Sequence, residues 1–120
     1  QEYKQEYKDF ITGYKSTITS GEEVGVAISR LAQRFCEANT EYGLALCAFN
    51  SVAAGFEQTM DEVSGKPLSS AKSKVLADAT PEASRLIMAK VDVGNIEQMI
   101  MSLKSLQKGM ILEQNNAGVL

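Results

Sequence analysis

A run of apolar residues spaced three and four apart, with no proline to interrupt it, restricts the fold of this chain most strongly. Its members are Val24, Ile28, Leu31, Phe35, Ala38, Tyr42, Ala45, Phe49, Val52, Phe56, Met60 and Val63. This spacing produces one apolar side along a helix, with a shift of the seven-residue repeat after Val52. Just before it, Ser20 and Glu23 have the spacing of a capping box, in which each side chain accepts from the other's backbone N–H. The sequence therefore predicts a helix over residues 21–63.

Two shorter helices are predicted on either side of this one. Residues 2–19 begin with two copies of Gln-Glu-Tyr-Lys, which set Tyr3 and Tyr7 one helical turn apart on an apolar stripe. Residues 64–67, Ser-Gly-Lys-Pro, are typical of a helix end, since glycine adopts the left-handed conformation readily and proline cannot continue a helix. A short helix rich in Ser and Lys is predicted next, within residues 68–79. Its apolar residues at helical spacing are Leu68, Ala71, Val75 and Leu76.

A last helix is predicted over residues 81–113, with Thr80 as its N-cap and Pro81 as its first helical residue. Gly94 is a position at which this helix could kink or divide. Its apolar residues again follow a three-and-four spacing: Leu86, Ala89, Val93, Ile96, Ile100, Leu103, Leu106 and Met110.

These patterns predict an all-α fold, an antiparallel bundle of three to five helices with one dominant long helix and no strand. Unbroken, the long helix would measure about 64 Å, whereas a compact globule of this chain length is roughly 35 Å across. We therefore expect an elongated bundle. A break near Gly43 would instead give a compact bundle. Residues 1–113 are predicted to form a single helical-bundle domain, and residues 114–120 a flexible tail or linker.

Composition excludes several chemistries. The chain has no histidine, which removes imidazole metal ligands, imidazole acid–base catalysis and phosphohistidine relay. Glu37 and Glu41 lie one turn apart, but di-iron bundle sites also need histidine, so we interpret both as solvated acids. The net charge of −3 gives no general attraction to nucleic acid. No catalytic residue, cofactor site or metal site is predicted.

The longest uncharged run, residues 42–56, is shorter than the about 20 apolar residues that span a membrane, so no transmembrane segment is expected. No signal peptide is recognisable in the chain. Cys36 and Cys47 lie on the predicted long helix about 16 Å apart, too far for a disulfide. We interpret them as free thiols and as small buried apolar residues, which favours a cytoplasmic location.

Two groups of residues are candidates for contacts with other molecules. Small residues four apart along the long helix would let a neighbouring backbone approach closely, which we interpret as tight helix packing. With the adjacent tyrosine and two methionines that lie off the main stripe of the last helix, the candidate interface is Tyr42, Gly43, Cys47, Ser51, Gly55, Met88 and Met101. The candidate contacts for an anionic partner are Lys66, Lys72 and Lys74.

The sequence thus favours a protein that acts through protein–protein contacts, as an assembly subunit, an adaptor or a chaperone-like bundle, rather than an enzyme. We expect a protein partner or self-association into a homo-oligomer through apolar helix faces. One alternative is a compact carrier of a lipid or other apolar small molecule, with a cavity lined by Phe35, Phe49, Phe56 and the methionines. A third is a membrane-associated helical dimer.

Overall fold

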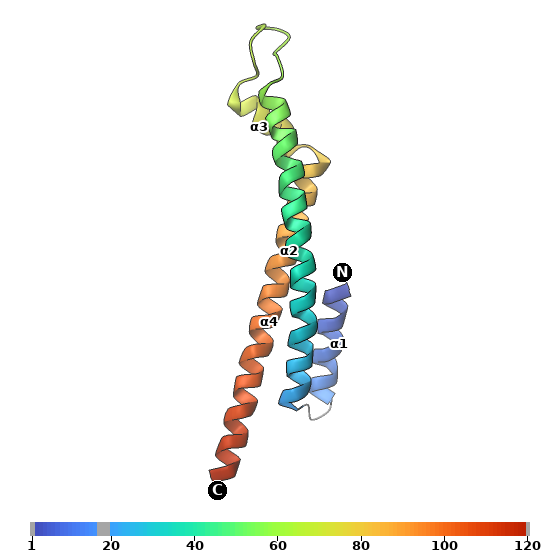
Figure 1. Cartoon of the computed structure of the whole chain (residues 1–120), viewed down its shortest axis with the longest axis vertical. Helices are drawn as coiled ribbons and strands as arrows, with labels where there is room; N and C mark the ends of the chain where they lie inside the picture. The colour runs from blue at the N-terminus through green and yellow to red at the C-terminus, as the bar shows by residue number, and fades with distance from the viewer. Residues whose placement is uncertain (1, 17–19, 120) are drawn as a thin grey trace. The chain divides into compact units, whose positions relative to one another are not determined.

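The computed structural model describes the backbone of residues 2–16 and 20–119. Within these residues it contains four helices: α1 (Glu2–Ser16), α2 (Gly21–Glu57), α3 (Ser70–Asp78) and α4 (Pro81–Val119) (Figure 1). No strand occurs in the described ranges, where one isolated bridge pairs Met60 with Pro67. The predicted all-α class is therefore confirmed. Residues 17–19, where the first helix was expected to continue, lie outside the described residues.

The chain divides into two compact units, and α2 and α4 contribute to both. Unit 1 comprises Gln1–Glu37 and Gly94–Leu120, and unit 2 comprises Ala38–Val93. The single domain predicted for residues 1–113 stays a prediction.

The apolar run along α2 is confirmed up to Phe56. None of its members from Val24 to Phe56 is exposed, and Val24, Leu31 and Ala45 are buried. At the start of the helix, the Ser20 Oγ accepts from the Glu23 N–H at 3.2 Å, as the capping-box spacing predicts. The helix passes through Gly43 without a break, so the long helix is confirmed at this position and the alternative break is wrong.

The predicted end of the long helix at residue 63 is wrong, because α2 stops at Glu57. Backbone N–H groups of Gln58 and Thr59 donate to carbonyls three residues back, at 3.3 and 3.1 Å, which tightens the last turn. Thr59 Oγ1 also donates to the Gly55 carbonyl at 2.9 Å, and the Thr59 carbonyl accepts from Leu68 N–H at 2.9 Å. These bonds divert the chain into a turn, and Met60 and Val63 are exposed there, at 55% and 97%.

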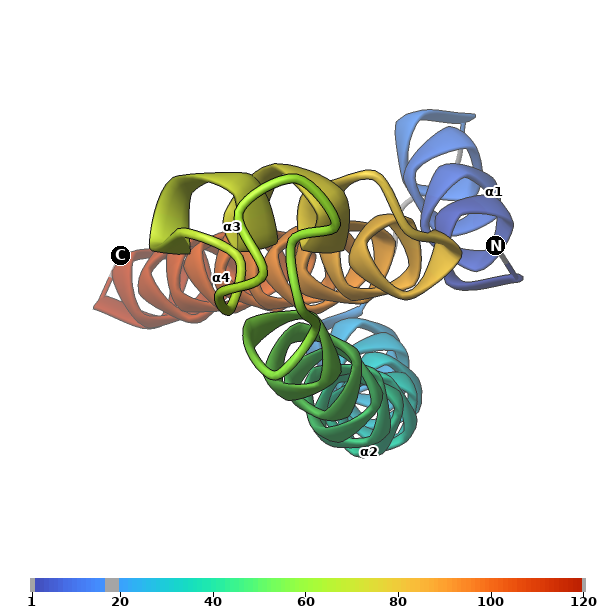
Figure 2. The same ribbon diagram turned by 90° about the horizontal axis from the view of Figure 1, so that it is seen from above.

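Helix α3 confirms the predicted short helix, but its burial is the reverse of what its apolar spacing suggests. It starts at Ser70 rather than residue 68, since Leu68 is held in the turn and Ser69 is the N-cap, accepting from Lys72 N–H at 3.2 Å. Ser73 and Ala77 are its buried residues, and the Ser73 hydroxyl donates to the Phe56 carbonyl of α2 at 3.4 Å. Figure 2 shows the backbone of α3 and of the turn that leads into it from α2. Val75 and Leu76 are exposed instead.

The start of α4 is held by the predicted cap. Thr80 Oγ1 accepts from Ala83 N–H at 3.2 Å and donates to the Ala77 carbonyl of α3 at 2.6 Å. We expect Thr80→Ala to lower the free energy of unfolding by about 1 kcal/mol, the usual cost of a lost threonine cap. Chemical denaturation measures this, and Thr80→Ser, which keeps the hydroxyl, should recover most of the loss. An equal loss in both variants would contradict a capping role.

Beyond the cap, the apolar stripe of α4 is confirmed, because all of its predicted members from Leu86 to Met110 are buried or half-buried. Gly94 does not divide the helix. The end predicted near residue 113 is wrong, since helical backbone continues to Val119 where a tail or linker was expected. No proline lies between these positions, and Gly118 is the only glycine, so nothing in this stretch forces an earlier end.

The two units bury different kinds of side chain. In unit 1 the buried residues are Tyr3, Val24, Leu31, Ile96 and Leu103. In unit 2 they are Ala45, Ser73, Ala77, Ala83 and Ala89. Among the described residues, unit 1 therefore has a core of large apolar side chains, whereas unit 2 fully buries only small ones.

Candidate functional site

Large apolar side chains of unit 2 are exposed on three helices. On α2, Leu44 is 57% exposed, and on α3, Val75 is 68% exposed. On α4, Ile87 is 63% exposed. We call the full group the exposed apolar set of unit 2: Leu44, Leu46, Val75, Leu76, Ile87, Met88 and Val91. A contiguous exposed apolar patch is a mark of an interaction site, and within this set Val75 and Leu76 line one groove.

A shallow apolar groove of about 350 Å³ lies along α3 and is lined by Leu68, Ala71, Lys72, Val75 and Leu76. These include all four residues at the apolar spacing predicted for α3. The spacing therefore identified an apolar face correctly, but that face is open rather than packed on the rest of unit 2.

The predicted small-residue ridge on α2 is also open. Gly43, Cys47, Ser51 and Gly55 are exposed, and a Cβ at either glycine would meet nothing within 4 Å. No described neighbour packs on Gly43 or Gly55, so the ridge as a contact surface stays a prediction. Tyr42, the fifth candidate on α2, is half-buried.

Neither cysteine is in a disulfide, as predicted, but both are exposed. Their interpretation as small buried apolar residues is therefore wrong. Both lie on the side of α2 away from its buried run, which the spacing of the run itself implies.

The two candidate methionines are exposed, Met88 at 59% and Met101 at 54%, as their positions off the main stripe suggest. Met88 belongs to unit 2 and Met101 to unit 1, so the structure assigns them to different units. Met88 lines a groove of about 560 Å³ with Glu41 and Arg85. In that groove Arg85 Nε donates to Glu41 Oε1 at 2.7 Å, and this bond lowers the pKa of Glu41 and raises that of Arg85.

Of the three candidate lysines, Lys72 already has a carboxylate partner. Its Nζ lies 3.2 Å from Asp61 Oδ2, within the turn between α2 and α3. Asp61 Oδ1 accepts from Val63 N–H at 2.9 Å, and this bond, followed by the one from Lys72, lowers the pKa of Asp61. Lys66 and Lys74 are exposed. The candidate anion contact stays a prediction, in which Lys72 of α3 is already paired with Asp61 of the turn.

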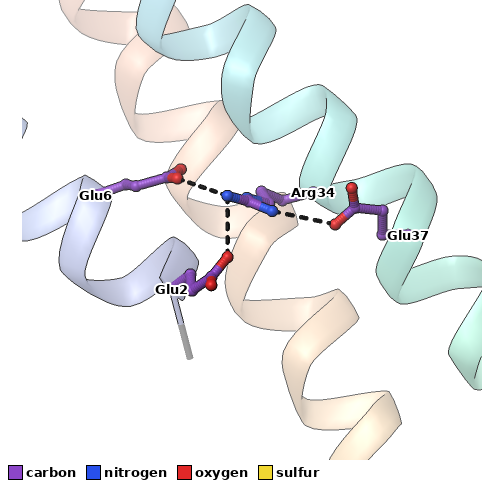
Figure 3. Close-up of polar contacts among 4 residues, drawn as sticks. All are labelled: Glu2, Glu6, Arg34 and Glu37. Carbon is purple, nitrogen blue, oxygen red and sulfur yellow. Dashed lines mark hydrogen bonds and ion pairs between the residues drawn. The ribbon is translucent and has the colours of Figure 1, made fainter.

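A charged cluster in unit 1, not anticipated from the sequence, centres on Arg34 of α2. Its guanidinium lies 3.1 Å from Glu2 and 2.8 Å from Glu6, both on α1, and 3.3 Å from Glu37 (Figure 3). The hydrogen bond to Glu6, followed by that to Glu37, raises the pKa of Arg34. The only sequence signal is the tetrapeptide repeat, which sets Glu2 and Glu6 one turn apart. Glu37 and Glu41 thus each pair with an arginine instead of being simply solvated.

Within the described ranges, no group of three or more metal-capable side chains comes together. No described helix is long and apolar enough to cross a membrane.

Comparison with protein-family models, with curated proteins and with solved structures finds no match to this chain.

Proposed function

We propose that this protein is a non-enzymatic interaction module, which assembles with a second copy of itself through the exposed apolar set of unit 2. The observation that carries the proposal is the burial pattern of unit 2. Its fully buried side chains are alanines and one serine, while Leu44, Leu46, Val75, Leu76, Ile87 and Val91 are exposed. Burial of large apolar side chains is the main favourable term in folding and association. Contact with another chain would bury the large apolar side chains that unit 2 leaves exposed.

A second copy fits this surface better than a charged partner. Between Glu41 and Glu57, α2 carries no charged residue, so two copies can meet along it without like-charge repulsion. The open ridge at Gly43 and Gly55 leaves room for a helix to approach closely. In a two-fold dimer the same patch faces itself, and the uncharged residues 42–56 of α2 would meet their own copy.

We also propose that the helices of unit 1 run antiparallel, as the sequence predicts. Two sets of contacts support this arrangement. Arg34 pairs with Glu6, and the next turn of α1, at Phe10, shares a groove with Ala27, which precedes Arg34 on α2. On α4, Gln107 Nε2 donates to the Gly21 carbonyl at the start of α2, at 3.1 Å, and Leu103, one turn earlier on α4, shares a groove with Leu31, which lies further along α2.

Val75→Asp tests the assembly proposal on a residue whose exposure makes loss of the fold unexpected. We expect the unaltered chain to form a dimer or larger assembly and the variant to associate at least about tenfold more weakly, because a charge would be buried in an apolar contact. Absolute molar mass is measured by light scattering and sedimentation over a concentration series, under reducing conditions so that the exposed thiols do not cross-link the chains.

Ser70→Asp is the matched control, since it adds the same charge to an exposed position of α3 without removing apolar surface. It should associate like the unaltered chain. The proposal is wrong if the unaltered chain is monomeric at every concentration, or if Val75→Asp and Ser70→Asp associate equally well.

A further inference from the structure

The turn between α2 and α3, residues 58–69, presents apolar side chains that the proposed function does not use. Val63 is 97% exposed and Met60 is 55% exposed. Both continue the apolar spacing of α2, but both lie beyond its end at Glu57. A single exposed apolar residue is common on protein surfaces, whereas a pair held on a fixed turn can act as a binding element. We call residues 58–69 the Val63 turn.

Hydrogen bonds fix the shape of the Val63 turn. Asp61 N–H donates to the Lys66 carbonyl at 2.7 Å, and Gly65 N–H donates to the Asp61 carbonyl at 2.8 Å. Asp61 Oδ1 accepts from Val63 N–H, and Gly65 has a φ of +69°, which glycine adopts without strain. The ion pair between Asp61 and Lys72 joins the turn to α3. The tip is therefore ordered before any contact, which removes part of the entropy cost of binding.

The charges beside Val63 have opposite signs. Glu62 precedes it and Lys66 follows it, and both are exposed. The other two charges near the turn, Asp61 and Lys72, are paired with each other. An apolar groove with both a carboxylate and a cation on its rim matches this tip. An anionic membrane surface matches it less well, because Glu62 is next to Val63.

Unit 1 contains a groove of this kind, of about 480 Å³. Apolar side chains from three helices line it: Phe10 of α1, Val26, Ala27 and Leu31 of α2, and Leu103 of α4. Its charged lining residues include Asp9, Glu23 and Arg30, which are exposed and so are accessible to a partner. None of the phenylalanines that the sequence suggested for a carrier cavity lines it. The groove thus offers apolar surface, carboxylates for Lys66 and a guanidinium for Glu62.

We propose that the Val63 turn of one copy binds in the unit 1 groove of a second copy. Val63 then lies on Val26, and Lys66 and Glu62 each lie beside a charge of the opposite sign. The contact joins two different surfaces, so it is heterologous, unlike the two-fold contact proposed for unit 2. One turn against one groove is at the low end of interface sizes, below roughly 1,200 Å², so we expect a transient contact.

The test mixes two variants of the full chain, each of which keeps one half of the contact. Isotope-labelled Val63→Asp keeps the groove and loses the apolar tip of the turn. Unlabelled Val26→Asp keeps the turn and loses apolar lining of the groove. When the unlabelled chain is titrated into the labelled one, we expect saturable NMR shifts at Phe10, Ala27 and Leu103. The labelled chain by itself, over the same concentration range, should show no such shifts.

The matched control changes only the tip of the unlabelled chain. Val26→Asp combined with Val63→Asp should bind at least about tenfold more weakly, because a charge would enter an apolar groove. Val26→Asp combined with Val63→Ile should bind within about threefold, because the tip stays branched and apolar. If Val26→Asp unfolds unit 1, the unaltered chain replaces it as the unlabelled partner, with the same shifts expected.

Self-association through the exposed apolar set would shift signals of Leu44 and Val75 instead of those of the groove. Failure of that association and failure of the turn-to-groove contact are therefore distinguishable. Two results would overturn the turn-to-groove contact. One is the absence of saturable shifts in the groove, and the other is equal binding by partners that carry Val63→Asp and Val63→Ile.

Discussion

Replacement of Ile96 by alanine is expected to lower the free energy of unfolding by about 2–5 kcal/mol, the largest effect of any conservative change considered for this chain. Ile96 is 1% exposed and is among the largest fully buried side chains of the described residues. Its truncation removes apolar contacts and leaves a cavity that unit 1, built around a few large side chains, can only partly close. Chemical denaturation followed by circular dichroism measures the change in midpoint.

Ile111→Ala is the matched control, because it makes the same chemical change on the same helix at a residue that is 49% exposed. Its expected loss is under about 1 kcal/mol. Similar losses for Ile96→Ala and Ile111→Ala would contradict the core assigned to unit 1.

The second large effect is expected at Arg34. Arg34→Met keeps the apolar stem of the side chain and removes the charge that pairs with Glu2, Glu6 and Glu37. Three carboxylates then face one another without a cation, and two of them are on α1. We expect the backbone amides of α1 to exchange with solvent several-fold faster, while those of unit 2 keep their protection. Hydrogen exchange followed by NMR resolves the two groups of amides.

The control for this change is Arg30→Met, one turn earlier on α2 and exposed. It should leave the α1 amides protected. Unchanged α1 exchange in Arg34→Met would mean that apolar contacts such as those of Tyr3, which is 7% exposed, hold α1 without the arginine.

Local signals explain how much of the fold the sequence predicts. Apolar spacing identified the buried sides of α2 and α4, and the hydroxyls of Ser20 and Thr80 marked the helix starts, because caps and stripes depend on residues within a few positions of each other. The end of α2 depends on hydrogen bonds of the following turn, which compete with those of the helix, and apolar spacing gives no information about them. Met60 and Val63 continue the pattern, but the Thr59 hydroxyl and the backbone pairing with Leu68 stop the helix before them.

The candidate surfaces were predicted less well, because they depend on contacts between distant residues. Ser73 is buried and Val75 exposed since the Ser73 hydroxyl reaches the Phe56 carbonyl, a choice that the sequence of α3 alone cannot reveal. Arg34 stands among several charged residues of α2, and only the fold brings Glu2 and Glu6 beside it. The small-residue spacing of the ridge at Gly43 and Cys47 can be read from the sequence. Whether another helix packs on that ridge cannot.

The tetrapeptide repeat of α1 has a consequence for how this helix finds its place. Gln-Glu-Tyr-Lys occurs twice in succession. A shift of α1 by four residues along α2, in either direction, therefore brings one glutamate and one tyrosine to the places that the other glutamate and the other tyrosine hold now. Ion pairs therefore distinguish poorly between neighbouring alignments. The first residue to break the periodicity with a bulky side chain is Phe10, which lines the groove of unit 1. In one of these shifts a ring would replace the Glu6 carboxylate, so Phe10 disfavours that alignment of α1 on α2 in addition to the loss of one ion pair.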